Sequence, residues 1–147
     1  MNLSPGRNGK PLGILLVEDD DGDAKAIQRA FEKTNAASII KRAVDGIEAL
    51  EILRSAPSKS QLPDPRILLV DLDMPRMNGT QFIKAVREDA NLRHSIVFVL
   101  TTSKREEDKM AASDLNVAGY ISKATAREDF LNLINLLNCY WHIVEIP

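Results

Sequence analysis

Five short apolar segments, each followed by a segment of helical periodicity, most constrain the fold of this 147-residue chain. Each apolar segment is short enough for a buried strand, and the alternation with helical segments indicates βα units with a parallel sheet. The expected strands are residues 12–17, 38–43, 67–70, 96–100 and 117–122. The second expected strand carries Lys41 and Arg42, which favours a position at the edge of the sheet. The sequence therefore predicts an α/β fold of three layers, with helices on both faces of one sheet.

The segments between these strands place apolar residues at spacings that bring them to one face of a helix. The residues expected to face inward are Ala24, Ile27, Ala30 and Phe31, then Ile47, Leu50 and Leu53, then Phe82, Ile83 and Val86, and finally Met110, Ala111 and Leu115. Asp45 with Glu48 and Ser103 with Glu106 have the spacing of a capping box, which predicts where two helices begin. A last helix is expected over about residues 127–137.

The chain length suits one domain with its own core. Residues 1–11, rich in Gly, Pro, Ser and Asn, are expected to form a loose arm, residues 12–138 the domain, and residues 139–147 an apolar tail. A single cysteine, Cys139, cannot form an intrachain disulfide, and no signal-peptide or membrane-spanning pattern occurs. A cytoplasmic protein without a membrane partner is therefore expected. The net charge of −2, without a dense basic patch, argues against nucleic-acid binding.

Polar side chains follow four of the expected strands at the points where they end. They are Glu18 and Asp19 after the first strand, Asp71 and Asp73 after the third, Thr101 after the fourth and Lys123 after the fifth. Because the carboxyl ends of parallel strands share one edge of the sheet, these side chains are expected to form one site. Carboxylates held close together require a cation, and oxygen ligands without His or Cys favour Mg²⁺.

A carboxylate beside Mg²⁺ and a lysine can act as a nucleophile toward phosphorus and form an acyl phosphate. Phosphoryl transfer depends mainly on positioning and on neutralising the equatorial oxygens, which Mg²⁺, Lys123 and the Thr101 hydroxyl would supply. A structural reading remains for Asp20 and Asp21, which suit helix capping or an exposed helix N-terminus. Tyr120 also needs no function, because it fits a half-buried position in a strand.

The same residues lie in five motifs with a characteristic order, namely ILLVEDD (14–20), VDGIEAL (44–50), VDLDMPRMNG (70–79), VLTTS (99–103) and GYISK (119–123). In this order the motifs resemble the receiver domain of two-component response regulators, over nearly the whole chain. The resemblance implies a flavodoxin-like (βα)5 sandwich with strand order 2-1-3-4-5 and a C-terminal extension. It also implies a phosphoacceptor signalling protein that catalyses only its own phosphotransfer and dephosphorylation, with a histidine kinase as its partner.

The resemblance assigns a role to each matching position. Asp71 is the phosphoacceptor, Glu18 and Asp19 bind Mg²⁺ through their carboxylates, Asp73 binds it through its main-chain carbonyl, Thr101 and Tyr120 are switch residues, and Lys123 pairs with the phosphoryl group. Most receivers have Pro after this lysine and a cis peptide before that Pro, whereas this chain has Ala124. A cis bond without proline is costly, so the conformation of the Lys123–Ala124 peptide stays open.

Further features resemble the single-domain regulators of bacterial and cyanobacterial phytochrome kinases. These are the long loop before the third strand, LTTSKREED (100–108), the Lys-Ala departure, and a tail with Trp and a final Pro. The likeness implies a light-sensing histidine kinase and a dimer. The last helix and tail carry more apolar residues than one buried face needs, which favours a homodimer interface over an interior packing role. The expected interface residues are Leu133, Leu136, Tyr140, Trp141 and Ile143.

Two other function classes fit less well. Asp71-Leu72-Asp73 is also the Asp-x-Asp motif of haloacid-dehalogenase-type phosphatases, but that family has it on the first strand, with Thr or Val four residues after the nucleophile. Here the motif follows the third strand, and Pro75 stands at that later position. A flavodoxin-like FMN carrier would need a Ser, Thr and Gly-rich phosphate loop after the first strand, where this chain has acids.

Overall fold

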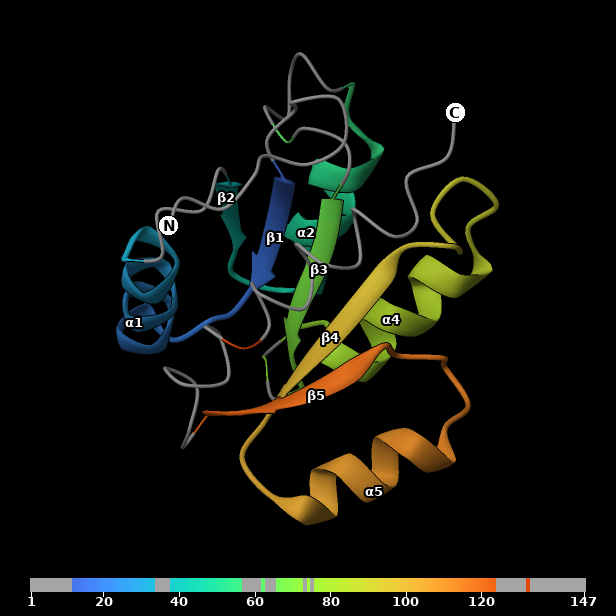
Figure 1. Cartoon of the computed structure of the whole chain (residues 1–147). Coiled ribbons are helices and arrows are strands. Elements are labelled where there is room, and N and C mark those ends of the chain that lie inside the picture. The colour runs from blue at the N-terminus through green and yellow to red at the C-terminus, as the bar shows by residue number, and fades with distance from the viewer. Residues whose placement is uncertain are drawn as a thin grey trace.

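Five parallel strands form the sheet, in the order β2-β1-β3-β4-β5 (Figure 1). The computed structural model describes residues 12–33, 38–56, 62, 66–72, 74, 76–123 and 132. The strands are β1 (Leu12–Val17), β2 (Ser38–Ala43), β3 (Arg66–Asp71), β4 (Ile96–Thr101) and β5 (Gly119–Ser122). This order confirms the predicted fold class, and β2 lies at an edge as expected.

Helices cover both faces of the sheet and bury two separate apolar clusters (Figure 1). They are α1 (Asp21–Glu32), α2 (Gly46–Arg54), α4 (Gly79–Glu88) and α5 (Lys104–Ala112). In β1, Ile14 and Leu16 pack with α1, whereas Leu15 and Val17 join the cluster that contains α2 and α4. A central strand covered on both faces needs apolar residues on both sides, which explains the unbroken apolar segments Ile67–Val70 of β3 and Ile96–Leu100 of β4.

Most of the expected inward-facing residues are buried, but Ile47 and Ala111 are exposed, and Leu115 packs inward from outside the helix that was expected to carry it. Ile47 is 37% exposed, because the buried face of α2 is centred on Ala49, Leu50 and Leu53 and leaves Ile47 to one side. Ala111 is exposed on α5. Leu115 packs against the same core from the loop beyond α5, since the helix ends before it.

The fifth strand begins two residues later than predicted. Asp114 and Asn116 both have positive φ, of 57° and 55°, so the chain is still turning as it approaches the sheet. The first hydrogen bond to the neighbouring strand comes from the Ala118 N–H, which donates to the Val97 carbonyl at 2.7 Å. Val117 therefore precedes β5 instead of beginning it.

The predicted N-caps are correct, but the reciprocal half of each capping box differs. Asp45 accepts a hydrogen bond from the Glu48 N–H at 2.9 Å, and Ser103 accepts one from the Glu106 N–H at 3.2 Å. The Glu48 carboxylate, however, accepts from the Val44 N–H at 3.1 Å, one residue before the cap. The Glu106 carboxylate likewise accepts from the residue that precedes its cap. Each carboxylate still satisfies a backbone donor at the start of its helix.

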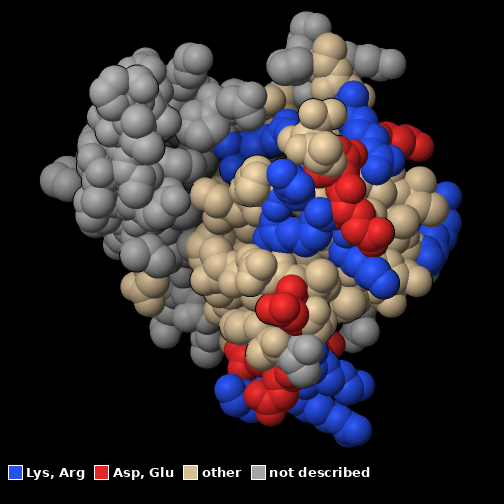
Figure 2. Space-filling view, turned by 90° about the vertical axis from the view of Figure 1, so that its right-hand side faces the viewer, with Lys and Arg blue, Asp and Glu red and all other residues tan. Residues whose placement is uncertain are grey.

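Charged side chains of both signs occupy the face shown in Figure 2, with α5 at the bottom of the view. On α5, Lys104 lies 3.7 Å from the carboxylates of both Glu107 and Asp108. Met110 is the one buried side chain among those described on this helix. Most of α5 therefore faces water.

The expected last helix at about 127–137, the N-terminal arm and the C-terminal tail lie outside the described residues, apart from residue 132. The proposed interface residues Leu133, Leu136, Tyr140, Trp141 and Ile143 belong to that part of the chain, as does Ala124. The dimer therefore stays a prediction, and the conformation of the Lys123–Ala124 peptide stays open. Within the described residues, none of the helices is long and apolar enough to cross a membrane.

Gly79 allows α4 to begin directly against the end of β3. Its N–H donates to the Leu72 carbonyl at 3.1 Å. A Cβ at this position would overlap the main-chain carbonyl of Asp71 and lie 2.7 Å from the Leu72 Cα. Asn78 caps the helix in a full capping box with Gln81, with bonds of 2.9 and 3.0 Å. The Asn-Gly pair of the sequence thus fixes the chain that follows Asp71.

We predict that Gly79→Ala lowers the free energy of unfolding by about 1–3 kcal/mol, because the added methyl group meets backbone atoms that cannot move aside. Urea denaturation measures this loss. Gly22→Ala is the matched control, since its Cβ would meet only the carboxylate of Asp20 at 3.3 Å and alanine favours a helix. Equal losses in the two variants would contradict the prediction.

Candidate functional site

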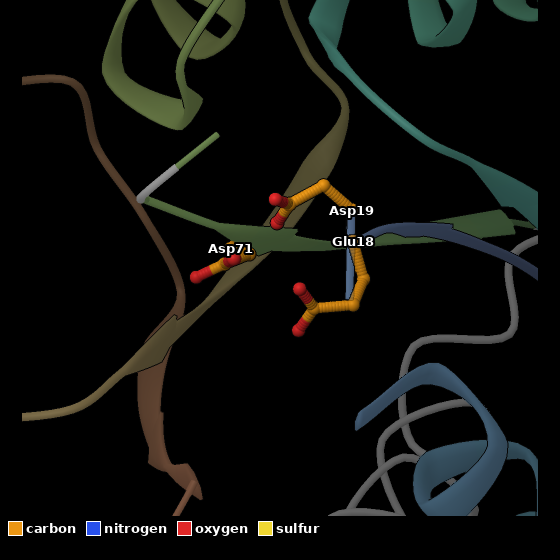
Figure 3. A group of neighbouring side chains, drawn as sticks. All are labelled: Glu18, Asp19 and Asp71. Atoms are coloured by element: carbon orange, nitrogen blue, oxygen red, sulfur yellow. The ribbon is translucent and has the colours of Figure 1, made fainter. Parts of the chain in front are cut away.

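Three carboxylates converge at the carboxyl edge of the sheet (Figure 3). Glu18 and Asp19 directly follow β1, and Asp71 is the last residue of β3. The two strands are neighbours in register, so their ends meet, and oxygen atoms of all three side chains lie within 4.8 Å of one another. Glu18 and Asp71 are buried, whereas Asp19 is exposed. The cluster is therefore reached by solvent from the side of Asp19.

Lys123 supplies the positive charge among these acids. Its Nζ lies 2.7 Å from Glu18 Oε1, 3.0 Å from Asp23 Oδ2 and 3.3 Å from Asp71 Oδ2. Burial alone would lower the pKa of Lys123, but its contacts with Glu18 and Asp23 and the nearby charge of Asp71 outweigh that effect and raise the pKa. The lysine thus stays charged, which is how two buried carboxylates are tolerated at the strand ends.

The donor set fits a hard divalent cation. Glu18, Asp19 and Asp71 offer carboxylate oxygens alone, the ligands that Mg²⁺ prefers, and Mg²⁺ keeps several waters when few protein ligands are present. One lysine cannot balance three carboxylates and Asp23 as well. A divalent ion on the exposed side, near Asp19, would supply the remaining positive charge.

Hydrogen bonds hold the turn that carries Glu18 and Asp19. The Arg42 Nε donates to the Glu18 carbonyl at 2.9 Å, and the Asp20 N–H donates to Glu18 Oε2 at 3.2 Å. Asp20 is the N-cap of α1, and the side chain of Asp21 is 82% exposed and 2.7 Å from Arg42 Nη1. The structural reading of Asp20 and Asp21 is therefore confirmed.

Thr101 reaches the same edge from β4. It is buried and ends the strand, and the pairing of Asp71 with Leu100 places it one residue beyond the partner of Asp71. Tyr120 is half-buried in β5 and packs against the cluster beneath α2 and α4, as a strand aromatic would. Asp73 lies outside the described residues.

The chain matches the response regulator receiver domain family over residues 14–135. This chain belongs to that family. It is 28% identical over 138 residues to the response regulator Rcp1 of Synechocystis sp. (strain ATCC 27184 / PCC 6803 / Kazusa), which covers 93% of this chain and 94% of Rcp1. Membership contradicts the phosphatase and FMN-carrier alternatives.

Solved receiver structures share the fold. The bacteriophytochrome response regulator AtBRR is 33% identical, with a TM-score of 0.73 over 83% of this chain and 89% of AtBRR. The phosphorylated cyanobacterial phytochrome response regulator RcpA is 28% identical, with a TM-score of 0.69 over 91% of this chain and 95% of RcpA. The Mn²⁺-bound form of Rcp1 is 27% identical, with a TM-score of 0.68 over 88% of this chain and 93% of Rcp1.

An ion pair ties the β3–α4 loop of this receiver to the start of α2. Arg76, with a φ of 60°, places its Nε 2.6 Å from Asp45 Oδ2, and the Gly46 N–H donates to the Met77 carbonyl at 3.1 Å. Asp45 is buried, and its pKa is lowered chiefly by the hydrogen bond from Arg76 and also by the Glu48 N–H. The sequence predicted Asp45 as a cap but gave no sign of its partner Arg76.

Asp23 is a second contact that the sequence did not predict. An acid in the first turn of a helix is already favoured by the helix dipole, so its residue type carries no further signal. The structure shows that it also reaches Lys123, 100 residues away in the chain.

We predict that Asp45→Ala lowers the free energy of unfolding by about 0.5–2 kcal/mol at neutral pH, through the loss of an N-cap. Asp45→Asn keeps the cap and removes only the charge. Because the pKa of Asp45 is below its ordinary value of 3.8, its carboxylate contributes stability above that value and loses the contribution as the pH falls through the lower, folded pKa. The stability difference between the native protein and Asp45→Asn should therefore be constant from about pH 7 to 5 and shrink toward pH 3. Urea denaturation across this range tests the prediction, and a difference that grows on acidification would refute it.

Proposed function

We propose that this protein is a single-domain response regulator that accepts a phosphoryl group from a histidine kinase onto Asp71 in a Mg²⁺-dependent reaction. The observation that carries the proposal is the convergence of Glu18, Asp19 and Asp71 with Lys123 at one edge of the sheet. The match to the response regulator Rcp1, which spans 93% of this chain and 94% of Rcp1, also supports the proposal.

In the proposed reaction an oxygen of the Asp71 carboxylate attacks the phosphorus of a phosphohistidine. The new P–O bond forms as the P–N bond breaks, and the electron pair of that bond returns to the imidazole nitrogen of the kinase. The Lys123 ammonium, 3.3 Å from Asp71 Oδ2 before transfer, lies close enough to neutralise a phosphoryl oxygen. Mg²⁺, held by Glu18, Asp19, Asp71 and the Asp73 carbonyl, would neutralise the remaining equatorial charge. The same site would later admit water to hydrolyse the acyl phosphate.

The proposed output is a change of surface that begins at Thr101. Its hydroxyl would turn toward the phosphoryl group on Asp71, with Tyr120 moving inward behind it. Because α5 starts three residues after Thr101, this movement is transmitted to α5 and to the adjoining β5. Such a response is a local electrostatic event that biases a two-state element.

We also propose a phytochrome-type histidine kinase as the partner, in the cytoplasm, and a homodimer through the C-terminal residues 133–143. The relatives AtBRR and RcpA, both phytochrome response regulators, support this assignment.

We predict that incubation with acetyl phosphate and Mg²⁺ adds one phosphoryl group to the native protein, and none without Mg²⁺ or in Asp71→Asn, because Asp71 is the nucleophile. Intact-protein mass spectrometry measures the addition. Asp108→Asn, which removes an exposed carboxylate from α5, is the matched control and should be phosphorylated like the native protein.

An adduct in Asp71→Asn would overturn the assignment of the nucleophile. If the native protein shows no adduct, beryllofluoride binding distinguishes fast hydrolysis from an inactive site. A folded native protein that neither gains mass nor binds beryllofluoride in the presence of Mg²⁺ would refute the proposed function.

A further inference from the structure

Lys123 has as many carboxylate neighbours as it has protons to donate. An ammonium group carries three donors, and carboxylate oxygens of Glu18, Asp23 and Asp71 lie 2.7, 3.0 and 3.3 Å from its Nζ, with a hydrogen bond donated to Asp23. Asp23 differs from the other two because it lies outside the carboxylate cluster that fits a metal ion. It comes from the first turn of α1, and 48% of its side chain is exposed.

A phosphoryl group on Asp71 would place further anionic oxygens beside the Lys123 ammonium, and these would compete with the carboxylates that it contacts at rest. Glu18 is 0% exposed and makes the shortest contact, so its release would leave a buried carboxylate without its cation, which is costly. Asp71 itself carries the new group. Asp23 is half-exposed, and water can replace Lys123 as its partner at small cost. Asp23 is therefore the carboxylate that is easiest to displace.

We propose that Asp23 is a positioning residue that holds Lys123 in the unphosphorylated protein and is displaced from it by the phosphoryl group. This inference rests on the proposed function, since it names what Lys123 leaves when Asp71 is modified. By holding Lys123, Asp23 opposes phosphorylation of Asp71. The contact between Asp23 of α1 and Lys123 after β5 exists only in the unphosphorylated protein.

The position of Asp23 in a helix N-terminus does not account for its contact with Lys123. An acid in the first turn favours the helix from any rotamer, because the dipole acts on the charge and not on a particular partner. Asp21 occupies the same turn and points its carboxylate at Arg42 instead, 2.7 Å from Nη1. Substituting Asp21 and Asp23 in turn therefore separates the general effect of a charge in the first turn from the specific contact with Lys123.

The test compares beryllofluoride affinity in the presence of saturating Mg²⁺, by isothermal titration calorimetry, among four proteins. We expect Asp23→Asn to bind about two- to fivefold more tightly than the native protein, the factor that corresponds to a lost half-exposed ion pair. Asp21→Asn removes the same charge from the same turn without touching Lys123, and should bind with native affinity. Asp23→Glu can restore the contact and should return the affinity toward the native value.

Each outcome decides between the two proposals. If the native protein binds beryllofluoride and Asp23→Asn binds equally or more weakly, the inference fails and the proposed function stands. An equal gain in beryllofluoride affinity in Asp21→Asn would show that the effect comes from net charge alone. That result would also overturn the inference. If the native protein does not bind at all, the proposed function fails and takes the inference with it. Damage to the fold cannot imitate the expected result, because a destabilised site does not gain affinity.

Discussion

The contact between the Lys123 ammonium and two buried carboxylates is the interaction on which this structure depends. Glu18 follows β1 and Asp71 ends the adjacent β3, in a sheet whose interior is otherwise apolar, and burying carboxylates there without a nearby cation is costly. The chain brings this cation from the far side of the sheet, at the end of β5. Lys123 reaches Glu18 and Asp71 only when β1, β3, β4 and β5 are assembled, which couples the chemistry to the fold of the sheet.

The sheet order brings the described residues of the site together at neighbouring strand ends. β1 and β3 are neighbours and supply the acids, while β4 lies next to β3 and supplies Thr101, and Lys123 follows β5, the strand beyond β4. Gly79 and the pair formed by Asp45 and Arg76 then hold the chain that leaves Asp71. The chain that follows Asp71 is therefore fixed by backbone packing at Gly79, whereas the side of the site near Lys123 depends on contacts between side chains.

Much of this arrangement could be predicted from the sequence because it depends on regular geometry. Buried parallel strands produce apolar segments, and their carboxyl ends share an edge. The sequence alone therefore predicts that Glu18, Asp71 and Lys123 lie close together. The contacts of Asp23 and Arg76 could not, because they depend on the rotamers of side chains that are far apart in sequence. Ile47 was misplaced because the small residues Gly46 and Ala49 set the buried face of α2, and neither is a strong apolar signal.

The helices that flank the site differ in how firmly they are attached. α4 buries Phe82, Ile83 and Val86 and starts in backbone contact with β3, whereas α5 buries one of its described side chains, Met110. Free energies of local opening vary across a protein with the amount of apolar surface that each segment buries. Displacing the segment that follows Thr101 therefore requires less free energy than displacing most other described parts of the molecule. A small change in the electrostatics of the site can then become a change of shape there while the rest of the sheet keeps its stability.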